Sequence, residues 1–384
     1  PSGPPGECAG GQAQAASTAA GDGEPGNDLS WPPVAPIGDP SAGSGRGQLL
    51  VLAGQAAMQV SNWDEADQLF ASALEHLPDT GHDHAHVEAH RLRAELAYIR
   101  YDLRQAQAHL DQAGTAARTC PDRTCRARIL ITESRLENRL ANSGPPRPSP
   151  QPTVKTTHGA PTLASTPAGL PGAVRPTPGS PAYYSVNEAA EARHHRDRAN
   201  SYARAAVDLA RDLADTHTLA QALDHAGEHT TALALYTQIG DRWGQAHAED
   251  GLGEVARGRG DLEGAAAHLG TALTLSTQIG DRWGQANAED GLGHVARARG
   301  DLEGAAAHSA AALTLHTQIG NRWGQANAEQ GLGHVARARG DLEGAAAHYA
   351  AALTLYSEIG MDSQAERVRR DLAKLTRPDQ TGDA

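Results

Sequence analysis

The sequence predicts an all-α protein in which helical hairpins stack into a solenoid, in two blocks joined by a disordered Pro-rich linker. The first observation is an internal repeat, because the string TQIG recurs at Thr237, Thr277 and Thr317, 40 residues apart each time. The second is that Gly and Asp stand at fixed places between helix-length segments of each copy. The third is the absence, from the repeated region, of the period-two alternation and Asn-Gly turns that indicate strands.

One repeat unit is predicted to be a pair of helices joined by a tight turn. Asp281 stands where an N-cap residue would accept a bond from the backbone, and Gly300 ends the first helix because Gly enters the left-handed conformation without steric cost. Asp301 then caps the second helix, and Gly320 ends it. Apolar and small residues follow a helical spacing along both segments. Each unit therefore has an apolar side that its neighbours must cover.

The copies are nearly identical, which favours recent duplication. Residues 277–316 and 317–356 differ at four pairs of positions, which are Asp281/Asn321, Asp290/Gln330, Ser309/Tyr349 and His316/Tyr356. Trp283 and its counterparts Trp243 and Trp323 lie just inside the first helices, where we expect them to pack between repeats. Gly293 and its counterparts lie inside the same helices, and we expect them to allow the paired helix to approach closely.

The rest of the chain is divided by composition. Residues 1–46 and the linker 142–184 are rich in Gly, Pro and Ser and lack apolar periodicity, so we expect both to be disordered. Residues 47–141 form a degenerate helical block, and residues 185–376 form the C-terminal solenoid. Residues 377–384 are a tail.

Both blocks carry further signs of helical hairpins. In the first block one unit is marked by Leu50, Gly54, Ala57, Ala66, Phe70, Ala73 and Pro78. A second unit is predicted over 86–114 and one more helix over 121–141. Residues 187–236 predict a long helix followed by a short pair. An apolar stripe with basic residues opposite predicts a helix that covers the last repeat, and the stripe consists of Ala365, Val368, Leu372 and Leu375.

These spacings resemble the tetratricopeptide repeat (TPR) family. The matching residues are Leu292-Gly293, Gly300-Asp301-Leu302, Ala305 and Ala312. The resemblance covers residues 237–376, and Glu289 departs from it because the family usually has a bulky apolar residue there. The 40-residue form with GDRWGQANAE resembles repeats of actinobacterial regulatory proteins. In those proteins the repeats often follow a nucleotide-binding switch domain or a DNA-binding domain.

The resemblance also implies a partner-binding groove lined by the first helix of each unit. Carried over to this sequence, the groove residues are Asn287, Asn327, Asp290, Gln330, His294, His334, Arg257, Arg297 and Arg337. In the first copy the corresponding positions also hold His247, Asp250 and Glu254. Columns of Asn, His and Arg suit an extended peptide with amides and carboxylates to bond. The alternative is a solvated polar face, which duplication alone would produce.

Charge and composition exclude several other functions. The net charge of −13 argues against binding to nucleic acid or to an anionic membrane surface. No apolar run has the length of a transmembrane helix, and the first residues lack the features of a secretory signal. Three cysteines do not make a disulfide framework, so we expect a cytoplasmic protein.

The His-rich run 82–90 is the strongest candidate for metal chemistry. His86 and His90 share a helix face at a spacing that can chelate zinc, whereas Glu88 lies on another face and cannot act as their general base. Cys120 and Cys125 give a weak zinc signal, and isolated packing cysteines are the favoured interpretation. We therefore predict no metal and no cofactor.

No motif for catalysis stands out. The sequence lacks a phosphate-binding loop, a nucleophile elbow and paired carboxylates in a strand context, so we predict that the chain is not an enzyme. The favoured function is a protein–protein interaction scaffold that binds a protein or peptide segment in the groove of its solenoid. One alternative is the sensor arm of a transcriptional or nucleotide-switch regulator. The other is a metal-binding protein that uses His82–His90.

Overall fold

The structure, a computed structural model, describes residues 45–59, 62–77, 84–143 and 181–375. These ranges form fifteen helices and no strand, which confirms the all-α prediction. The helices are α1 (Gly45–Gln59), α2 (Trp63–His76), α3 (His84–Ile99), α4 (Leu103–Ala116), α5 (Arg123–Ser143), α6 (Pro181–Arg211), α7 (Thr216–His225), α8 (His229–Ile239), α9 (Arg242–Gly258), α10 (Leu262–Gln278), α11 (Arg282–Ala298), α12 (Leu302–Gln318), α13 (Arg322–Ala338), α14 (Leu342–Glu358) and α15 (Asp362–Leu375).

Several sequence predictions lie wholly or mostly outside the described residues. These are residues 1–44 of the segment expected to be disordered, residues 144–180 of the linker, His82 in the His-rich run and the tail 377–384. At the edges of these segments the helices extend further than predicted. Helix α1 begins at Gly45 and α6 begins at Pro181, inside the predicted linker. Proline suits the first position of a helix, where no backbone N–H is needed.

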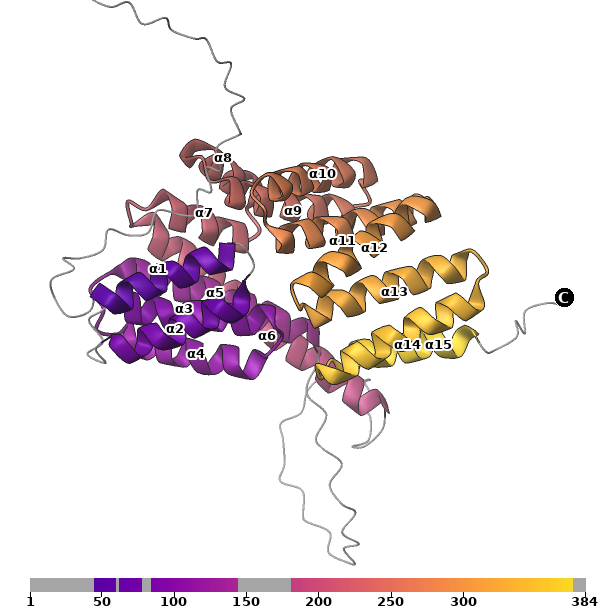
Figure 1. The fold of residues 1–384 in the computed structure, drawn as a ribbon, viewed down its shortest axis with the longest axis horizontal. Coiled ribbons are helices and arrows are strands. Elements are labelled where there is room, and N and C mark those ends of the chain that lie inside the picture. The colour runs from indigo at the N-terminus through magenta and orange to yellow at the C-terminus, as the bar shows by residue number, and fades with distance from the viewer. Residues whose placement is uncertain (1–44, 60–61, 78–83, 144–180, 376–384) are drawn as a thin grey trace, which may run out of the picture.

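The helices pack in chain order as a series of hairpins, α1/α2 to α13/α14, and α15 covers the last one (Figure 1). The pairs α9/α10, α11/α12 and α13/α14 are the 40-residue copies, and each of their helices has 17 residues. The first helices of successive units also contact one another directly, α9 with α11 and α11 with α13. The units therefore form two layers, with the first helices in one layer and the second helices in the other.

The predicted helix ends are confirmed. The Asp281 carboxylate accepts from the backbone N–H groups of Trp283 and Gly284, each at 3.1 Å. Gly300 and Gly320 have φ angles of 80° and 68°, in the left-handed region. Because the same two devices recur in every copy, each helix starts and stops at the same register, and successive units stack without slipping.

The glycines inside the first helices lie where the second helix approaches closely, as predicted. A Cβ atom added at Gly253 would lie 2.6 Å from Leu269, and one at Gly333 would lie 2.6 Å from the Tyr349 ring. Any larger residue would push the two helices of the hairpin apart. The helix-destabilising effect of Gly is thus offset by close packing between the helices.

Helices α5 and α6 form a hairpin although residues 144–180 separate them in sequence. The Ser134 hydroxyl on α5 donates to the Ala199 carbonyl on α6 at 3.0 Å. The buried Glu137 carboxylate pairs with His195 at 2.6 Å and with Arg198 at 2.9 Å. The two helical blocks are therefore packed together in one continuous stack.

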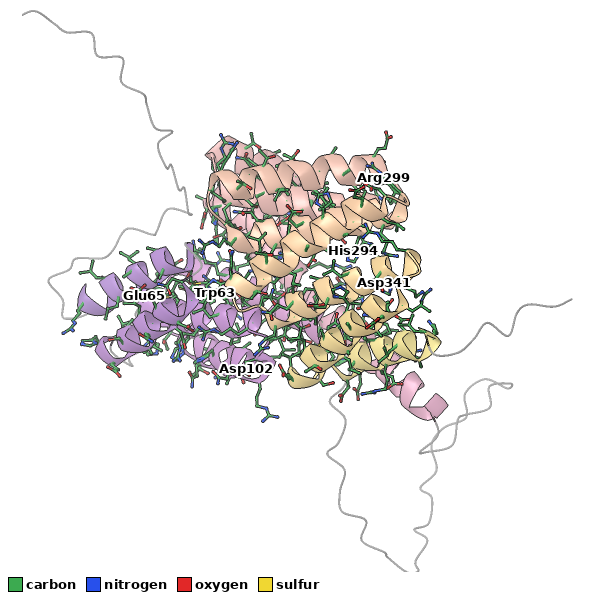
Figure 2. All side chains as sticks on the ribbon, turned by 45° about the vertical axis from the view of Figure 1, so that its right-hand side comes forward. Trp63, Glu65, Asp102, His294, Arg299 and Asp341 are labelled. Atoms are coloured by element: carbon green, nitrogen blue, oxygen red, sulfur yellow. The ribbon has the colours of Figure 1, made fainter. Side chains whose placement is uncertain are left out.

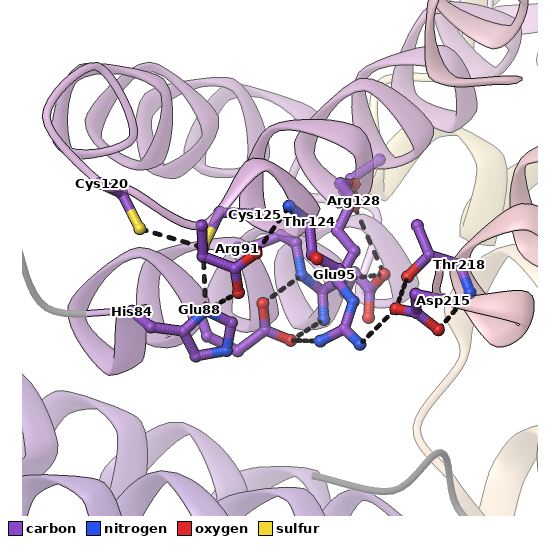
Figure 3. A network of polar contacts seen from close by, with 12 residues as sticks. His84, Glu88, Arg91, Glu95, Cys120, Thr124, Cys125, Arg128, Asp215 and Thr218 are labelled. Atoms are coloured by element: carbon purple, nitrogen blue, oxygen red, sulfur yellow. Dashed lines mark hydrogen bonds and ion pairs between the residues drawn. The ribbon is translucent and has the colours of Figure 1, made fainter. Parts of the chain in front are cut away.

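A buried charge network ties α3 to α5 and to the start of α7 (Figure 3). Arg91 donates to Glu88 at 2.5 and 2.9 Å and to Glu95 at 2.7 Å. Arg128 lies 3.6 Å from Glu88 and 3.8 Å from Asp215, the N-cap residue of α7. Burial by itself would raise the pKa of Glu88, but the charge and hydrogen bonds of Arg91, assisted by Arg128, lower it to about 2.

The stack curves until its C-terminal end meets its N-terminal hairpins (Figure 1). Tyr101, after α3, stacks on Trp323 of α13 with ring centroids 6.0 Å apart. The Arg139 guanidinium on α5 lies over both rings, at 4.8 and 4.9 Å. Trp283 and Ile319 pack into the apolar cluster of α1 to α3. Trp283 and Trp323, near the N-terminal ends of α11 and α13, therefore contact the N-terminal hairpins.

None of the fifteen helices in the described ranges has both the length and the apolar character needed to cross a membrane.

Candidate functional site: a polar row on the first helices

Five of the predicted groove residues form a continuous row near the C-terminal ends of α9, α11 and α13. We call it the Arg/His row, and its members are Arg257, His294, Arg297, His334 and Arg337. Desolvation lowers the pKa of His334, and the positive charges of Arg297 and Arg337 lower it further. Desolvation and the charges of Arg257 and Arg297 likewise lower the pKa of His294. Each imidazole is thus close to arginines from two successive repeats.

The members of this row differ in how strongly the protein itself engages them. Arg257 pairs with Glu254 on its own helix at 2.5 Å, and His334 Nδ1 bonds the Tyr349 hydroxyl at 2.8 Å. His294, Arg297 and Arg337 are exposed. Arg297 forms no ion pair with any residue of the described ranges. Figure 2 places His294 on the C-terminal repeats, apart from Trp63 and Asp102 in the N-terminal hairpins.

Three other predicted groove residues bond the second helix of their own unit. Asp290 accepts from His316 Nε2 at 3.0 Å. Asn327 accepts from the Tyr356 hydroxyl, and Gln330 Oε1 lies 3.4 Å from the same hydroxyl. The Asp290, Asn327 and Gln330 side chains therefore hold hairpins together. The ninth predicted residue, Asn287, is half-buried on α11, and its role in partner binding stays a prediction.

The first copy has a buried cluster of His and Asp at the corresponding place. The two oxygens of Asp224, on α7, are bonded by His229 at 2.6 Å and by His247 at 2.7 Å. Burial would raise the pKa of Asp224, but these histidines hold it well below its usual range. Burial raises the pKa of Asp250 to about 6. Sequence reasoning missed Asp224 and His229 because both precede the region where the repeat is regular.

The tryptophans pack between units, as predicted. The His247 ring lies between those of Trp243 and Trp283, with centroid separations of 5.5 and 6.2 Å. Trp323 stacks on Tyr101 as described above. The three indoles are thus engaged by the protein itself, and they do not form a free row for stacking a ligand.

Glu289, the departure from the family pattern, has a partner within its own hairpin. His308 Nδ1 lies 2.6 Å from its carboxylate, and the other copies repeat the pair as His268 with Glu249 at 2.6 Å and His348 with Glu329 at 2.7 Å. In the sequence, each of these Glu residues is followed by a His at a spacing of 19 positions, and that spacing is the signal for the pair. An ion pair or hydrogen bond thus occupies the place where the family has apolar packing.

The His-rich run and the two cysteines lie close together, near α3. His86 and His90 have ring centroids 5.0 Å apart on α3, and His86 is buried. Cys125 is fully buried in the apolar cluster of α3 to α5, as its predicted packing role requires. The expectation that the cysteines are isolated is wrong, because Cys120 Sγ lies 3.4 Å from Cys125 Sγ and His84 Nδ1 lies 2.9 Å from it.

Comparisons with known proteins give structural likeness alone. No family model matches the sequence, and no curated protein matches it. A solved structure of a Rap protein complexed with Competence and Sporulation Factor aligns over 86% of this chain and 98% of that chain, with 11% identity and a TM-score of 0.45. The Cut9–Hcn1 hetero-tetramer of the APC/C aligns over 84% and 76%, with 14% identity and a TM-score of 0.30. Yeast Tom70 aligns over 86% and 97%, with 10% identity and a TM-score of 0.19.

Consecutive helical hairpins, a 40-residue unit with Gly at each helix end and a covering last helix define a TPR-like helical repeat protein. The actinobacterial type of the 40-residue repeat stays a prediction.

Proposed function

We propose that this protein is a protein-binding scaffold, and that the Arg/His row binds an extended, carboxylate-bearing segment of a partner. The observation that carries the proposal is Arg297. It is an exposed guanidinium without an ion pair in the described ranges, in a chain whose net charge is −13. A guanidinium offers a planar set of N–H donors that matches a carboxylate, so an anionic group is its natural partner.

The surroundings of Arg297 support the same interpretation. His294 and His334 flank it, and their lowered pKa values keep both imidazoles neutral at pH 7. A neutral imidazole both donates and accepts hydrogen bonds, so it suits the amides of a peptide backbone. Near the opposite ends of α11 and α13, Trp283 and Trp323 contact the N-terminal hairpins. The Arg/His row lies at the other end of these helices, away from those contacts, which supports it as the surface for a partner.

The proposal is tested by affinity capture from a lysate of the source organism with the full chain as bait. The double variant Arg297→Glu/Arg337→Glu reverses two charges of the row. The matched control, Arg282→Glu/Arg322→Glu, makes the same changes about 22 Å away along the same two helices. Both control residues are exposed, and the ion pair that Arg322 forms with Glu358 at 3.3 Å lies on the surface, so its loss should cost little stability. We expect at least one protein to be captured by the wild type and the control and to be lost with the row variant.

The variant Arg297→Lys/Arg337→Lys separates charge from shape. Lysine keeps the positive charge but lacks the planar fork, so we expect intermediate capture. If all four baits retain the same proteins while circular dichroism shows normal helicity, the row is not the binding surface. A regulatory arm that acts within a larger protein would then be the better-supported function.

A further inference from the structure

Three side chains with metal-binding atoms meet where the start of α3 faces the turn between α4 and α5 (Figure 3). They are His84, Cys120 and Cys125. His84 Nδ1 lies 2.9 Å from Cys125 Sγ, and the two sulfurs lie 3.4 Å apart. All three ligand atoms lie within 4.8 Å of one another. In the described ranges, no other group of three or more His, Cys, Asp or Glu residues brings its ligand atoms this close together.

The spacing of these atoms fits one tetrahedral ion after a small movement. Zn–S bonds of about 2.3 Å and a Zn–N bond of about 2.0 Å separate two sulfurs by about 3.8 Å and a sulfur from a nitrogen by about 3.5 Å. The observed separations are about half an ångström shorter than these values. His84 and Cys120 are partly exposed, so both side chains can retreat by that distance while the buried Cys125 stays in place.

The surroundings hold the donors in position. Cys125 is fully buried on α5 among apolar residues, which fixes its sulfur. Asp122 Oδ2 lies 3.2 Å from His84 Nδ1, and its Oδ1 accepts from the backbone N–H of Thr124 at 2.8 Å. The Asp122 side chain is about one-third exposed, so this side of the cluster is open to solvent. A carboxylate or a water molecule can complete the coordination from there.

We propose that His84, Cys120 and Cys125 bind a zinc ion, with Asp122 or a water molecule as the fourth ligand. Two thiols and one imidazole favour zinc over magnesium or calcium, which prefer oxygen. Zinc binds cysteine as the thiolate, so binding must displace the protons of both thiols. The ion would tie the first turn of α3 to the α4–α5 turn and so stabilise the N-terminal hairpins.

The test uses the full chain with Cys8→Ser, so that the two proposed thiols are the cysteines that remain. The reduced, metal-free protein is titrated with cobalt(II), whose thiolate complexes have a charge-transfer absorption, and the cobalt is then displaced with zinc. We expect one equivalent to bind with thiolate absorption. Cys120→Ser and Cys125→Ser should lose the absorption, and His84→Ala should bind at least tenfold more weakly.

His90→Ala is the matched control, because it removes a histidine of the same helix that lies outside the proposed ligand set, and we expect it to bind as the parent does. Because a cysteine variant can fail to fold, thermal unfolding gives a second measurement that does not depend on those variants. Zinc should raise the Tm of the parent and should not raise the Tm of His84→Ala. Three results would overturn the proposal. They are an absence of thiolate absorption in the parent, equal affinity in His84→Ala and the parent, and a Cys120–Cys125 disulfide that persists under the reducing conditions of the titration.

Discussion

The Asp290 carboxylate accepts a hydrogen bond from His316 Nε2 at 3.0 Å, and 40 residues later Gln330 and the Tyr356 hydroxyl face each other in the same way at 3.4 Å. These copies differ at four pairs of positions. Two of those pairs, 290/330 and 316/356, are therefore in contact with each other within each copy. Asn321, at a third of them, donates from Nδ2 to His316 Nδ1 at 3.2 Å. The changes at 290/330 and 316/356 are thus coupled, and both versions keep the buried ring of the second helix hydrogen-bonded.

This coupling predicts the result of a double-mutant cycle. Asp290→Gln and His316→Tyr should each lower the free energy of unfolding by about 1–3 kcal/mol, because each leaves a buried polar group without its matched partner. The double variant reproduces the pair found at Gln330 and Tyr356, so it should lose less than the sum of the single losses. Urea unfolding of the four proteins measures the coupling, and strictly additive losses would contradict it.

Two glycines on repeat helices should respond in opposite directions to alanine. Gly333→Ala places a methyl group 2.6 Å from the Tyr349 ring and should destabilise the protein. Gly270→Ala adds a methyl group with no atom within 4 Å in the middle of α10, and should stabilise by about 0.5–1 kcal/mol because Ala favours the helix. Thermal unfolding of both variants makes the comparison. A loss of stability at Gly270 equal to that at Gly333 would show that close helix approach does not explain these glycines.

The Glu88–Arg91 pair predicts a loss of stability in acid. The pKa of Glu88 is about 2 in the folded chain and 4.5 for the free side chain, so the pair contributes stability above about pH 4.5. The difference corresponds to about 3 kcal/mol, which is lost as the pH falls from about 4.5 towards 2. We expect Glu88→Gln to flatten this part of the profile of unfolding free energy against pH.

The control for this prediction is Glu366→Gln, which removes one partner of a surface pair with Arg369. Both of those side chains are substantially exposed, so the profile should stay within about 0.5 kcal/mol of the wild type. An unchanged acid profile in Glu88→Gln would mean that the buried network is not the source of the pH dependence.

The hairpins, the caps and the close approach at Gly333 could be predicted from the sequence, because each depends on residues within one or two helices. The joining of α5 to α6 could not be predicted, because Ser134 and Ala199 are 65 residues apart and no periodicity connects them. For the same reason the approach of His84 to Cys125, 41 residues away, left no trace in the spacing of either motif.

The candidate site was predictable in part. The repeat register identified the members of the Arg/His row, of which His294, Arg297 and Arg337 are exposed. The same register also assigned Asp290, Asn327 and Gln330 to the groove, because it fixes which helix face a residue occupies. It does not show that the ring of His316 or Tyr356 reaches that face from the second helix.

The central claim is that a partner segment contacts the Arg/His row, and site-specific photo-crosslinking tests it most directly. A photoreactive amino acid is placed at His294 in one protein and at Ala347, exposed on α14, in another. After irradiation in lysate, we expect an adduct with a specific protein from position 294, absent from position 347 and lost when Arg297→Glu/Arg337→Glu is added. Equal adducts from both positions, or an adduct that survives the charge reversal, would contradict the claim.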